Sequence, residues 1–410
     1  MSIHTDAQTI IQEALTACLP DQAVCRALEG RTFGAGRVFL VAVGKAAWQM
    51  AHCAARLLGD RLEAGVVVTK YGHSRGEIPR CAVYEGGHPV PDENSFRGTR
   101  AAMELVENLT AEDTVVFLVS GGGSALFECP LIPAEELSHL TQAMLACGAD
   151  IVEMNTVRKR LSAVKGGRFA QLCAPARVFS IVLSDILGDP LDMIASGPAY
   201  PDQSTCAQAQ AVAEKYQLPL SPQARALLQE ETPKALDNVE TVITGSVREL
   251  CAAAGAACRR LGYEPVLLTD QLCCQAKEAG SFLASIARTH QDTQKSLAFL
   301  AGGETVVLLT GQGKGGRNQE LALSAAQGIA GLADTLIFSL GSDGTDGPTD
   351  AAGGLVDGST KDRLEAAGLT IHQVLAENDA YHALDRVGGL IRTGPTGTNV
   401  NDVAVALIKR

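Results

Sequence analysis

The chain has 410 residues, 46% hydrophobic and 20% charged, so it is long enough for about two or three domains of ordinary globular composition. Its 46 acidic and 34 basic residues give a net charge of −12, which excludes nucleic-acid binding through general electrostatic attraction. The twelve cysteines show no zinc-type spacing, and neither a secretory signal nor a bilayer-spanning apolar run is evident, so we expect a cytoplasmic protein with reduced thiols and no membrane partner.

Short apolar runs alternate with longer amphipathic ones along the chain, which is typical of α/β proteins. The expected strands are Val38–Val43, Gly65–Thr69, Val115–Val119, Val178–Leu183, Thr241–Thr244, Pro265–Leu268, Leu297–Ala301, Thr305–Leu309 and Thr335–Leu340. The expected helices are Asp6–Leu19, Lys45–Leu58, Asn94–Asn108, Pro133–Ala146, Val157–Leu172, Ser221–Leu228, Val247–Leu261, Gln275–Arg288, Arg317–Ile329 and Ser359–Ala367. Apolar strands between helices predict mainly parallel sheets covered on both faces.

The segment Pro198–Asp237 holds several prolines and few strand-like runs, so it indicates a connection between domains. We place the boundary near residue 236, between an amino-terminal α/β domain (1–236) and a carboxyl-terminal one (237–410). Glycine, serine or charged residues follow most of the predicted strands, which is where open α/β sheets bind ligands. The sequence therefore predicts two Rossmann-like domains with a ligand cleft between them.

Three consecutive glycines follow the strand Val115–Val119. The run is Ser120, Gly121, Gly122, Gly123 and Ser124. Such a run lets backbone N–H groups point together toward an anion, and a following helix would add its positive end. The alternative is a tight strand-to-helix turn, which rarely needs three glycines. We therefore favour phosphate or carboxylate binding here.

A second glycine-rich run, Gly311–Gly316, fits G-x-G-x-x-G and lies between a predicted strand and a predicted helix. That context is the one a dinucleotide fingerprint requires. Lys314 and Arg317, however, suit a polyphosphate whose charge grows during transfer. A Walker A loop is absent, because Gly44-Lys45 has Phe39 where that motif has glycine.

Three carboxylates occur in the glycine-rich stretch after the last predicted strand: Asp343, Asp346 and Asp350. Crowded carboxylates repel one another unless a cation is nearby, and Mg²⁺ that carries nucleotide phosphates is the usual solution. A solvated acidic turn is the alternative, since Gly, Asp and Pro are also turn residues.

Five basic residues fall within Val157–Arg168, with no acid between them. A solvated helix face is the usual meaning of such a run, but a local site for an acidic substrate or a phosphate is equally consistent with it. Lys45 opens a predicted helix, where a positive charge opposes the helix dipole unless an anion is bound.

Three single residues have two readings each. Asp189 is a general base or the turn residue before Pro190. Glu304 binds a metal or a ribose hydroxyl. His88, in Gly86-Gly87-His88-Pro89, is a turn residue or a substrate contact.

Taken together, these segments resemble the class II glycerate kinases, the glycerate 2-kinase family with a MOFRL domain. The resemblance covers nearly the whole chain and rests on ordered motifs, namely Val-Gly-Lys45-Ala, Gly-Gly-His88-Pro, Ser120-Gly-Gly-Gly-Ser124, Asn155-Thr-Val-Arg-Lys, Lys165-Gly-Gly, Gly188-Asp189-Pro, Ser196-Gly-Pro, Gly302-Gly-Glu304, Gly315-Gly-Arg317-Asn-Gln-Glu320 and Gly-Ser-Asp343-Gly-Thr-Asp346-Gly-Pro-Thr-Asp350.

The resemblance implies ATP-dependent phosphorylation of D-glycerate at its 2-hydroxyl, with Mg²⁺. On this hypothesis Lys45 and Arg317 stabilise charge on the transferring group, and Asp189 orients or deprotonates the hydroxyl. The remaining residues divide into three groups: the glycerate carboxylate is held by Ser120–Ser124, Arg160 and Lys165; the nucleotide is contacted by Glu304, Gly313, Lys314, Gly315 and Asn318; and the metal is held by Asp343, Asp346 and Asp350.

Two rivals follow from the same residues. Family members are often labelled hydroxypyruvate reductase, after tartrate-utilisation operons, and an NAD(P)H-dependent reductase would use Gly311–Gly316 as its cofactor loop. A non-catalytic sensor of sugar acids or nucleotides would bind ligand without turnover. The oligomeric state, a homo-oligomer included, is left open by the sequence.

Overall fold

The computed structural model describes residues 2–410, which form two compact units. Unit 1 takes the chain up to Ala23, then Ser184–Gly188 and Gly245–Arg410, and unit 2 takes Val24–Leu183 and Asp189–Thr244. This division differs from the expected boundary near residue 236, because the first helix belongs with the carboxyl-terminal part of the chain. Its apolar side chains, such as Ile10 and Leu15, share a core cluster with Leu250 of that part.

Unit 2 is built on a six-stranded sheet with the order β3-β2-β1-β4-β5-β6. The strands are β1 (Val38–Val43), β2 (Leu62–Lys70), β3 (Cys81–Gly86), β4 (Thr114–Val119), β5 (Arg177–Leu183) and β6 (Val239–Gly245). The pairs β1–β2, β1–β4, β2–β3 and β4–β5 are all parallel. This is the strand order of the Rossmann fold, whose ligands bind where the order reverses, outside the carboxyl ends of β1 and β4.

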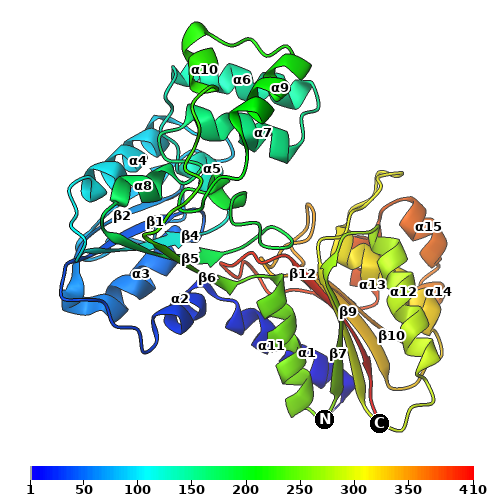
Figure 1. Cartoon of the computed structure of the whole chain (residues 1–410). Coiled ribbons are helices and arrows are strands. Elements are labelled where there is room, and N and C mark those ends of the chain that lie inside the picture. Colours follow the sequence, from blue (N-terminus) through cyan, green and yellow to red (C-terminus); the bar gives the residue numbers. More distant parts are fainter. Residues whose placement is uncertain (1) are drawn as a thin grey trace. The chain divides into compact units, whose positions relative to one another are not determined.

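Helices cover both faces of this sheet, as expected for buried parallel strands. They are α2 (Pro20–Leu28), α3 (Ala47–Leu58), α4 (Glu93–Val106), α5 (Gly123–Leu126), α6 (Ala134–Ala146), α7 (Ile151–Arg158), α8 (Arg168–Cys173), α9 (Cys206–Lys215) and α10 (Pro222–Leu227). Figure 1 shows α4 and α8 on one face and α2 and α3 on the other, while α6, α7, α9 and α10 gather into a small helical cluster with its own core.

The single helix expected over Val157–Leu172 is instead two helices, α7 and α8. Gly166 and Gly167 interrupt it with φ angles of 58° and 86°, in the left-handed region that ends a right-handed helix.

Unit 1 contains the second six-stranded sheet, with the order β11-β10-β9-β12-β8-β7. Its strands are β7 (Glu264–Leu272), β8 (Leu297–Gly303), β9 (Thr335–Gly341), β10 (Gly353–Asp357), β11 (Leu390–Ile391) and β12 (Asp402–Ile408). The pair β7–β8 is parallel, whereas β12 runs antiparallel to both β8 and β9, and β10 antiparallel to β9 and β11. The α/β class is confirmed, and this sheet is more antiparallel than the pattern predicted because the carboxyl-terminal strand inserts between β8 and β9.

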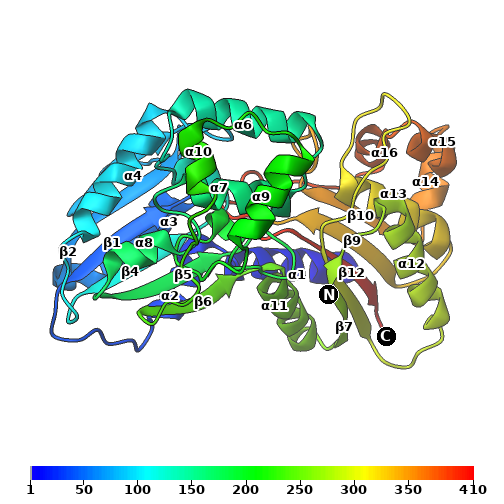
Figure 2. The same ribbon diagram turned by 45° about the horizontal axis from the view of Figure 1, so that its top comes forward.

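The helices of unit 1 are α1 (Ile3–Ala17), α11 (Val247–Arg260), α12 (Ala276–Thr289), α13 (Arg317–Ile329), α14 (Thr360–Ala366), α15 (Ile371–Ala376) and α16 (Ala380–Arg386). One core cluster joins α1 and α11 to the sheet, and a second joins α12, α13 and the three short carboxyl-terminal helices to its other face. Figure 2 shows α12 and α13 lying side by side along β9 and β10.

The strand expected over Thr305–Leu309 does not form. Only Val306 makes an isolated bridge, to Gln275, and Leu308 and Leu309 are exposed. Gly311–Gly316 therefore does not follow a strand. Within residues 2–410, no helix combines the length and apolarity needed to cross a bilayer.

Candidate active site

In unit 2, the loops after β1 and β4 are bonded to each other at the point where the strand order reverses. The Lys45 N–H donates to Gly121 O at 2.8 Å, and the Ala46 N–H donates to Ser120 Oγ at 3.1 Å. Gly44 has no room for a side chain, since a Cβ there would lie 2.3 Å from Ser120 Oγ. These contacts place Lys45 against the glycine run.

The glycine run presents a row of unused donors. Among the hydrogen bonds of residues 2–410, none is donated by the N–H groups of Gly121, Gly122, Gly123 or Ser124. Gly122 has φ 85°, and a Cβ there would lie 3.0 Å from His88 Cδ2 and 3.1 Å from Lys45 Cε. Both side chains therefore border the run, and consecutive amides beside a lysine form an anion site.

The charge around His88 is positive. Its pKa is lowered, first by burial and then by the nearby charges of Lys45, Lys70 and His73. Within the described chain, neither Lys45 nor Lys70 belongs to any of the ion pairs. In a chain of net charge −12, this group of basic side chains forms a local region of positive charge, which favours an anion.

Lys165 does not face a ligand, contrary to the expectation that it holds a carboxylate. It is fully buried and donates to Ser124 O at 2.8 Å and to Phe127 O at 3.0 Å, with Glu128 at 3.4 Å. Burial lowers the pKa of Lys165 to about 8, although the nearby Glu128 carboxylate acts to raise it. Lys165 therefore supports the glycine run from behind.

Arg160 is also an internal residue, contrary to the expectation that it holds the glycerate carboxylate. It is completely buried and donates to Thr156 O, to both oxygens of Ser204 and to the Glu231 carboxylate. Its bonds join α7 to the segment before α9 and leave no terminal N–H group for a substrate.

Arg158, two positions earlier, also reaches the glycine run, as Lys165 does, whereas Arg160 does not. Its Nη2 donates to Ser124 O at 3.2 Å and lies 3.8 Å from Glu128, while its Nε is buried without a hydrogen-bond partner among the described atoms. The sequence singled out the stretch but had no signal to distinguish Arg158 from Arg160.

The loop that carries Asp189 and Ser196 has strained backbone. Asp189, Ala195 and Ser196 have φ angles of 52°, 51° and 62°, which non-glycine residues rarely adopt. Ser196 donates to Asn155 Oδ1 at 2.9 Å and lies 3.1 Å from Ser124 Oγ, so the loop is bonded to the glycine run. One Asp189 oxygen is buried with no donor among the described residues, and is thus an acceptor for a hydroxyl.

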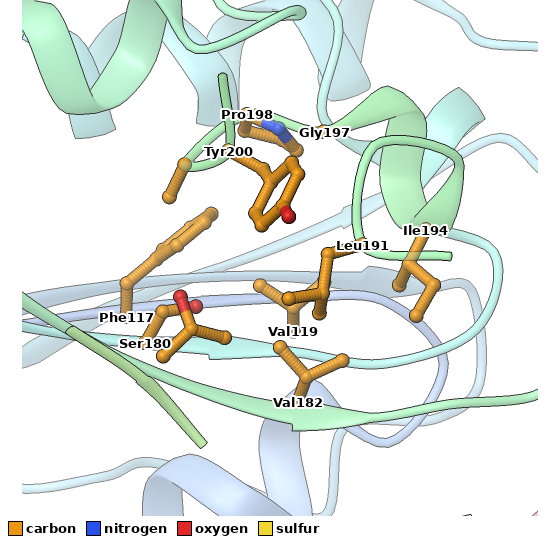
Figure 3. A pocket seen from close by; sticks show the side chains of 11 residues that line it. Phe117, Val119, Ser180, Val182, Leu191, Ile194, Gly197, Pro198 and Tyr200 are labelled. Atoms are coloured by element: carbon orange, nitrogen blue, oxygen red, sulfur yellow. The ribbon is translucent and has the colours of Figure 1, made fainter. Parts of the chain in front are cut away.

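A small cavity of unit 2 lies under the same loop and is not a substrate site. Figure 3 shows Tyr200, Leu191 and Ile194 above Phe117 and Val182 of the sheet. The cavity measures about 20 Å³, room for roughly one water molecule. It belongs to the packing that holds the loop on the sheet.

In unit 1, Arg317 is the first residue of α13 and is held by two acids. Its Nε and Nη2 donate to the two Asp402 oxygens at 2.5 and 3.0 Å, and its Nη1 donates to Glu304 at 2.9 Å. Burial acts to lower the pKa of Arg317, but Asp402 outweighs it and leaves the pKa above its ordinary value. Burial raises the pKa of Asp402, against the opposing effect of Arg317. The guanidinium is therefore fixed in orientation and permanently charged.

The glycines of Gly311–Gly316 are required by packing, which corrects their reading as a nucleotide loop. A Cβ on Gly311 would lie 2.3 Å from Glu377 Cα, and one on Gly313 would lie 2.4 Å from Asp379 Cβ. The Gly313 N–H donates to Glu377 O at 2.7 Å and the Lys314 N–H to Asp379 at 2.9 Å. Gly313 and Lys314 thus offer no free amide to a phosphate, although the Lys314 ammonium lies over the Tyr381 ring.

The amino terminus of α13 is already occupied by a carboxylate. Asp346 accepts from the N–H groups of Asn318 and Gln319, at 3.2 and 2.8 Å, and also from the Asn318 amide. Burial raises its pKa to about 7, although the two backbone bonds oppose this. Asp346 therefore caps the helix, and Asn318 is buried against it and Ser339 instead of contacting a nucleotide.

The three aspartates do not form one metal site. No group of three acidic, histidine or cysteine side chains in residues 2–410 is arranged to hold a metal ion. Asp350 bonds to Tyr381 at 2.6 Å and to Arg392. Asp343 uses one oxygen for the Thr345 N–H, and no bond in the described chain involves its other oxygen.

Comparison with known proteins matches two family models to successive parts of the chain. A domain of unknown function (DUF4147) matches residues 6–229, and the MOFRL family matches residues 297–402. The D-glycerate 2-kinase of Thermotoga maritima is 51% identical over 99% of each chain. The crystal structure of glycerate kinase from that organism superposes with a TM-score of 0.95, covering 98% of this chain and 99% of the other at 51% identity. A protein of Agrobacterium vitis that carries a hydroxypyruvate reductase name is 38% identical over 97% of this chain and 93% of its own.

Proposed function

The chain belongs to the MOFRL family of glycerate 2-kinases, and on that premise we propose that it transfers the γ-phosphoryl group of ATP to the 2-hydroxyl of D-glycerate. The product is 2-phosphoglycerate. The observation that carries the proposal is the anion site of unit 2, where free amides of the glycine run meet Lys45 at the Rossmann switch point.

Phosphoryl transfer is mainly a matter of positioning and charge stabilisation. We assign to Lys45 the stabilisation of the negative charge that develops on the transferring group. Its side chain borders Gly122, and its ammonium has no ion-pair partner in the described chain. The free amides of Gly121–Ser124 bind the anionic part of a substrate in the same place. Arg158, which reaches Ser124 of the glycine run, replaces Arg160 and Lys165 as the proposed carboxylate ligand, because both terminal nitrogens of Arg160 are bonded to Thr156, Ser204 and Glu231.

Asp189 is the proposed base for the substrate hydroxyl. Its buried oxygen lacks a donor, and the strained loop fixes its direction. When the hydroxyl oxygen attacks the γ-phosphorus, its proton moves to the Asp189 carboxylate, the bond from the γ-phosphorus to the bridging oxygen of the β-phosphate breaks, and ADP leaves. The neutral alcohol would otherwise be a poor nucleophile.

In unit 1, we propose that Arg317 binds and neutralises phosphate charge of the nucleotide. Two acids hold it, so its orientation is fixed before substrate arrives, and Glu304 is the partner that it can exchange for a phosphate oxygen because that side chain is half-exposed. Asp402, which is buried, keeps its two bonds to Arg317 throughout.

Of the three aspartates in the stretch after β9, Asp343 is the one that we propose for Mg²⁺. Mg²⁺ usually binds one or two carboxylates together with substrate phosphates and water, and Asp343 has an oxygen with no recorded partner among residues 2–410. When bound, the ion neutralises phosphate charge during transfer. Asp346 and Asp350 are assigned no metal, since the first caps α13 and the second is bonded to Tyr381.

The test is a paired assay with purified protein. We expect ADP release with D-glycerate, ATP and Mg²⁺, and no NADH consumption with hydroxypyruvate. NADH consumption without ADP release would establish the reductase instead, and silence in both assays would favour a sensor. Identification of the product as 2- or 3-phosphoglycerate checks which hydroxyl reacts. The proposed substrates are small molecules, so the reaction itself requires no macromolecular partner.

The roles are tested by substitution. Lys45→Ala and Arg317→Ala should each lower kcat by about 10²-fold or more, as does the loss of a charge that acts on the transition state. Arg248→Ala is a matched control, because its exposed side chain pairs with Asp270 on the surface. Near-wild-type kcat in either of the first two variants would show that the assignment is wrong.

A further inference from the structure

Two cysteine thiols on neighbouring helices of unit 2 lie in contact. Cys25 is on α2 and Cys53 is on α3, and their sulfur atoms are 3.6 Å apart. Figure 1 shows the two helices on the same face of the sheet. A disulfide bond is about 2.05 Å long, so the sulfurs need to approach by about 1.5 Å to be joined.

The two thiols differ in their access to solvent. Cys25 is half-buried and lines a surface hollow of about 640 Å³, together with Arg31 and Arg61. Cys53 is only 2% exposed. A small oxidant therefore reaches Cys25 first, and Cys53 lies behind it as the nearest sulfur.

We propose that Cys25 and Cys53 form a reversible disulfide when the protein meets a peroxide. The Cys25 thiolate attacks one peroxide oxygen, the O–O bond breaks, and a sulfenic acid and water are formed. The Cys53 thiolate then attacks the sulfenic sulfur, the S–S bond forms and a second water leaves. Two thiols are thereby oxidised by two electrons, and one hydrogen peroxide is reduced to two waters. A dithiol reductant reverses the step.

The pair would protect Cys25 from irreversible oxidation. A sulfenic acid with no thiol nearby is oxidised further to sulfinic acid, whereas one in contact with a second thiol is trapped as a disulfide. The bond would also tie α2 to α3, closing a loop of 28 residues, which restricts the unfolded chain. α3 begins two residues after Lys45, so the bond anchors the helix behind the proposed anion site.

The experiment uses the full-length protein, reduced, desalted and treated with hydrogen peroxide. Remaining thiols are alkylated and the protein is digested with trypsin without reduction. The sequence has no Lys or Arg before Arg26, so Cys25 falls in peptide 1–26 and Cys53 in peptide 46–56. We expect these two peptides to be joined with the loss of two hydrogens, and to separate after dithiothreitol. The oxidised protein should also melt several degrees higher than the reduced one.

Three variants make the assignment specific. Cys18 lies in the same tryptic peptide as Cys25, so Cys18→Ser should keep the cross-link, whereas Cys25→Ser should lose it. In Cys53→Ser the cross-link should also be lost, and Cys25 should instead go on to sulfinic acid. A cross-link that persists in Cys25→Ser, peroxide treatment that joins only other cysteines, or equal sulfinic acid at Cys25 with and without Cys53 would each overturn the proposal.

Discussion

Asp346 is the carboxylate whose environment makes the sharpest prediction, through the variant Asp346→Asn. Burial raises the pKa of Asp346 to about 7 in the folded protein, against an ordinary value of 3.8. Between these values the folded state holds a proton that the unfolded chain releases. The stability contributed by this group is therefore complete below about pH 4 and is lost as the pH rises through 7.

The substitution keeps the cap and removes the titration. An asparagine oxygen can still accept from the N–H groups of Asn318 and Gln319, and Asn is as good a helix cap as Asp. A shift of about 3 pKa units corresponds to about 4 kcal/mol, and about 2.5 kcal/mol of this develops between pH 5 and pH 8. We expect Asp346→Asn to have a higher free energy of unfolding than the wild type at pH 8. At pH 5 this difference between variant and wild type should be smaller by about 2.5 kcal/mol.

The assay is urea unfolding at pH 5, 6.5 and 8, followed by hydrogen exchange of α13 amides. Exchange is preferred because the single tryptophan, Trp48, is in unit 2 and reports on that unit instead. Asp357→Asn is the matched control, since burial acts to raise the pKa of Asp357 but bonds from Ser359 and the charge of Arg363 lower it. That variant should lose stability at pH 8, where the wild-type carboxylate is charged and bonded. A pH-independent difference for Asp346→Asn, or a loss of stability at pH 8, would show that the pKa of Asp346 is not raised in the folded protein.

The remaining predictions concern the proposed active site and its support. Gly122→Ala and Gly148→Ala should each lower the free energy of unfolding by about 1–2 kcal/mol, because their φ angles of 85° and 76° are unfavourable for alanine. Only Gly122→Ala should also lower kcat/KM, since its Cβ would crowd His88 and Lys45, whereas Gly148 has open space around it. Equal activity in the two variants would contradict this crowding. Burial lowers the pKa of Lys165 to about 8 in the folded protein, so the unfolded chain binds more protons than the folded one between pH 8 and pH 10.5, and the free energy of unfolding of the wild type should rise by about 3 kcal/mol over that range. Lys165→Met should remove this rise, and chemical unfolding across the same pH range measures it. Asp402→Asn should lower kcat about tenfold or more with little change in KM for glycerate, since Arg317 loses its fixed direction, and a change in KM alone would refute that role.

The glycine run that we propose as an anion site was recognisable because its signal is local. Three glycines in a row after an apolar strand allow amides to converge, and the structure places that run beside Lys45 and leaves its amides unused. The Rossmann strand order of this unit was not readable in detail, since the edge strand β3 has a mixed burial pattern and was missed.

Gly311–Gly316 shows how one pattern can have two physical causes. Its glycines match a dinucleotide fingerprint, yet they are required because Glu377 and Asp379 approach the backbone closely. No local feature of the sequence reveals a neighbour more than 60 residues away along the chain.

Sequence alone determined the α/β class, most of the helices and strands, the family and the positions of Lys45 and the first glycine run, because periodicity, glycine content and ordered motifs are local properties. Only the tertiary structure decided which charged groups are free to act. Arg317 meets Asp402 across 85 residues, Asp346 meets the amino terminus of α13, and Lys165 is buried against Glu128. A charge buried in a protein must find a partner, and the chain fold chooses that partner without regard to distance along the sequence.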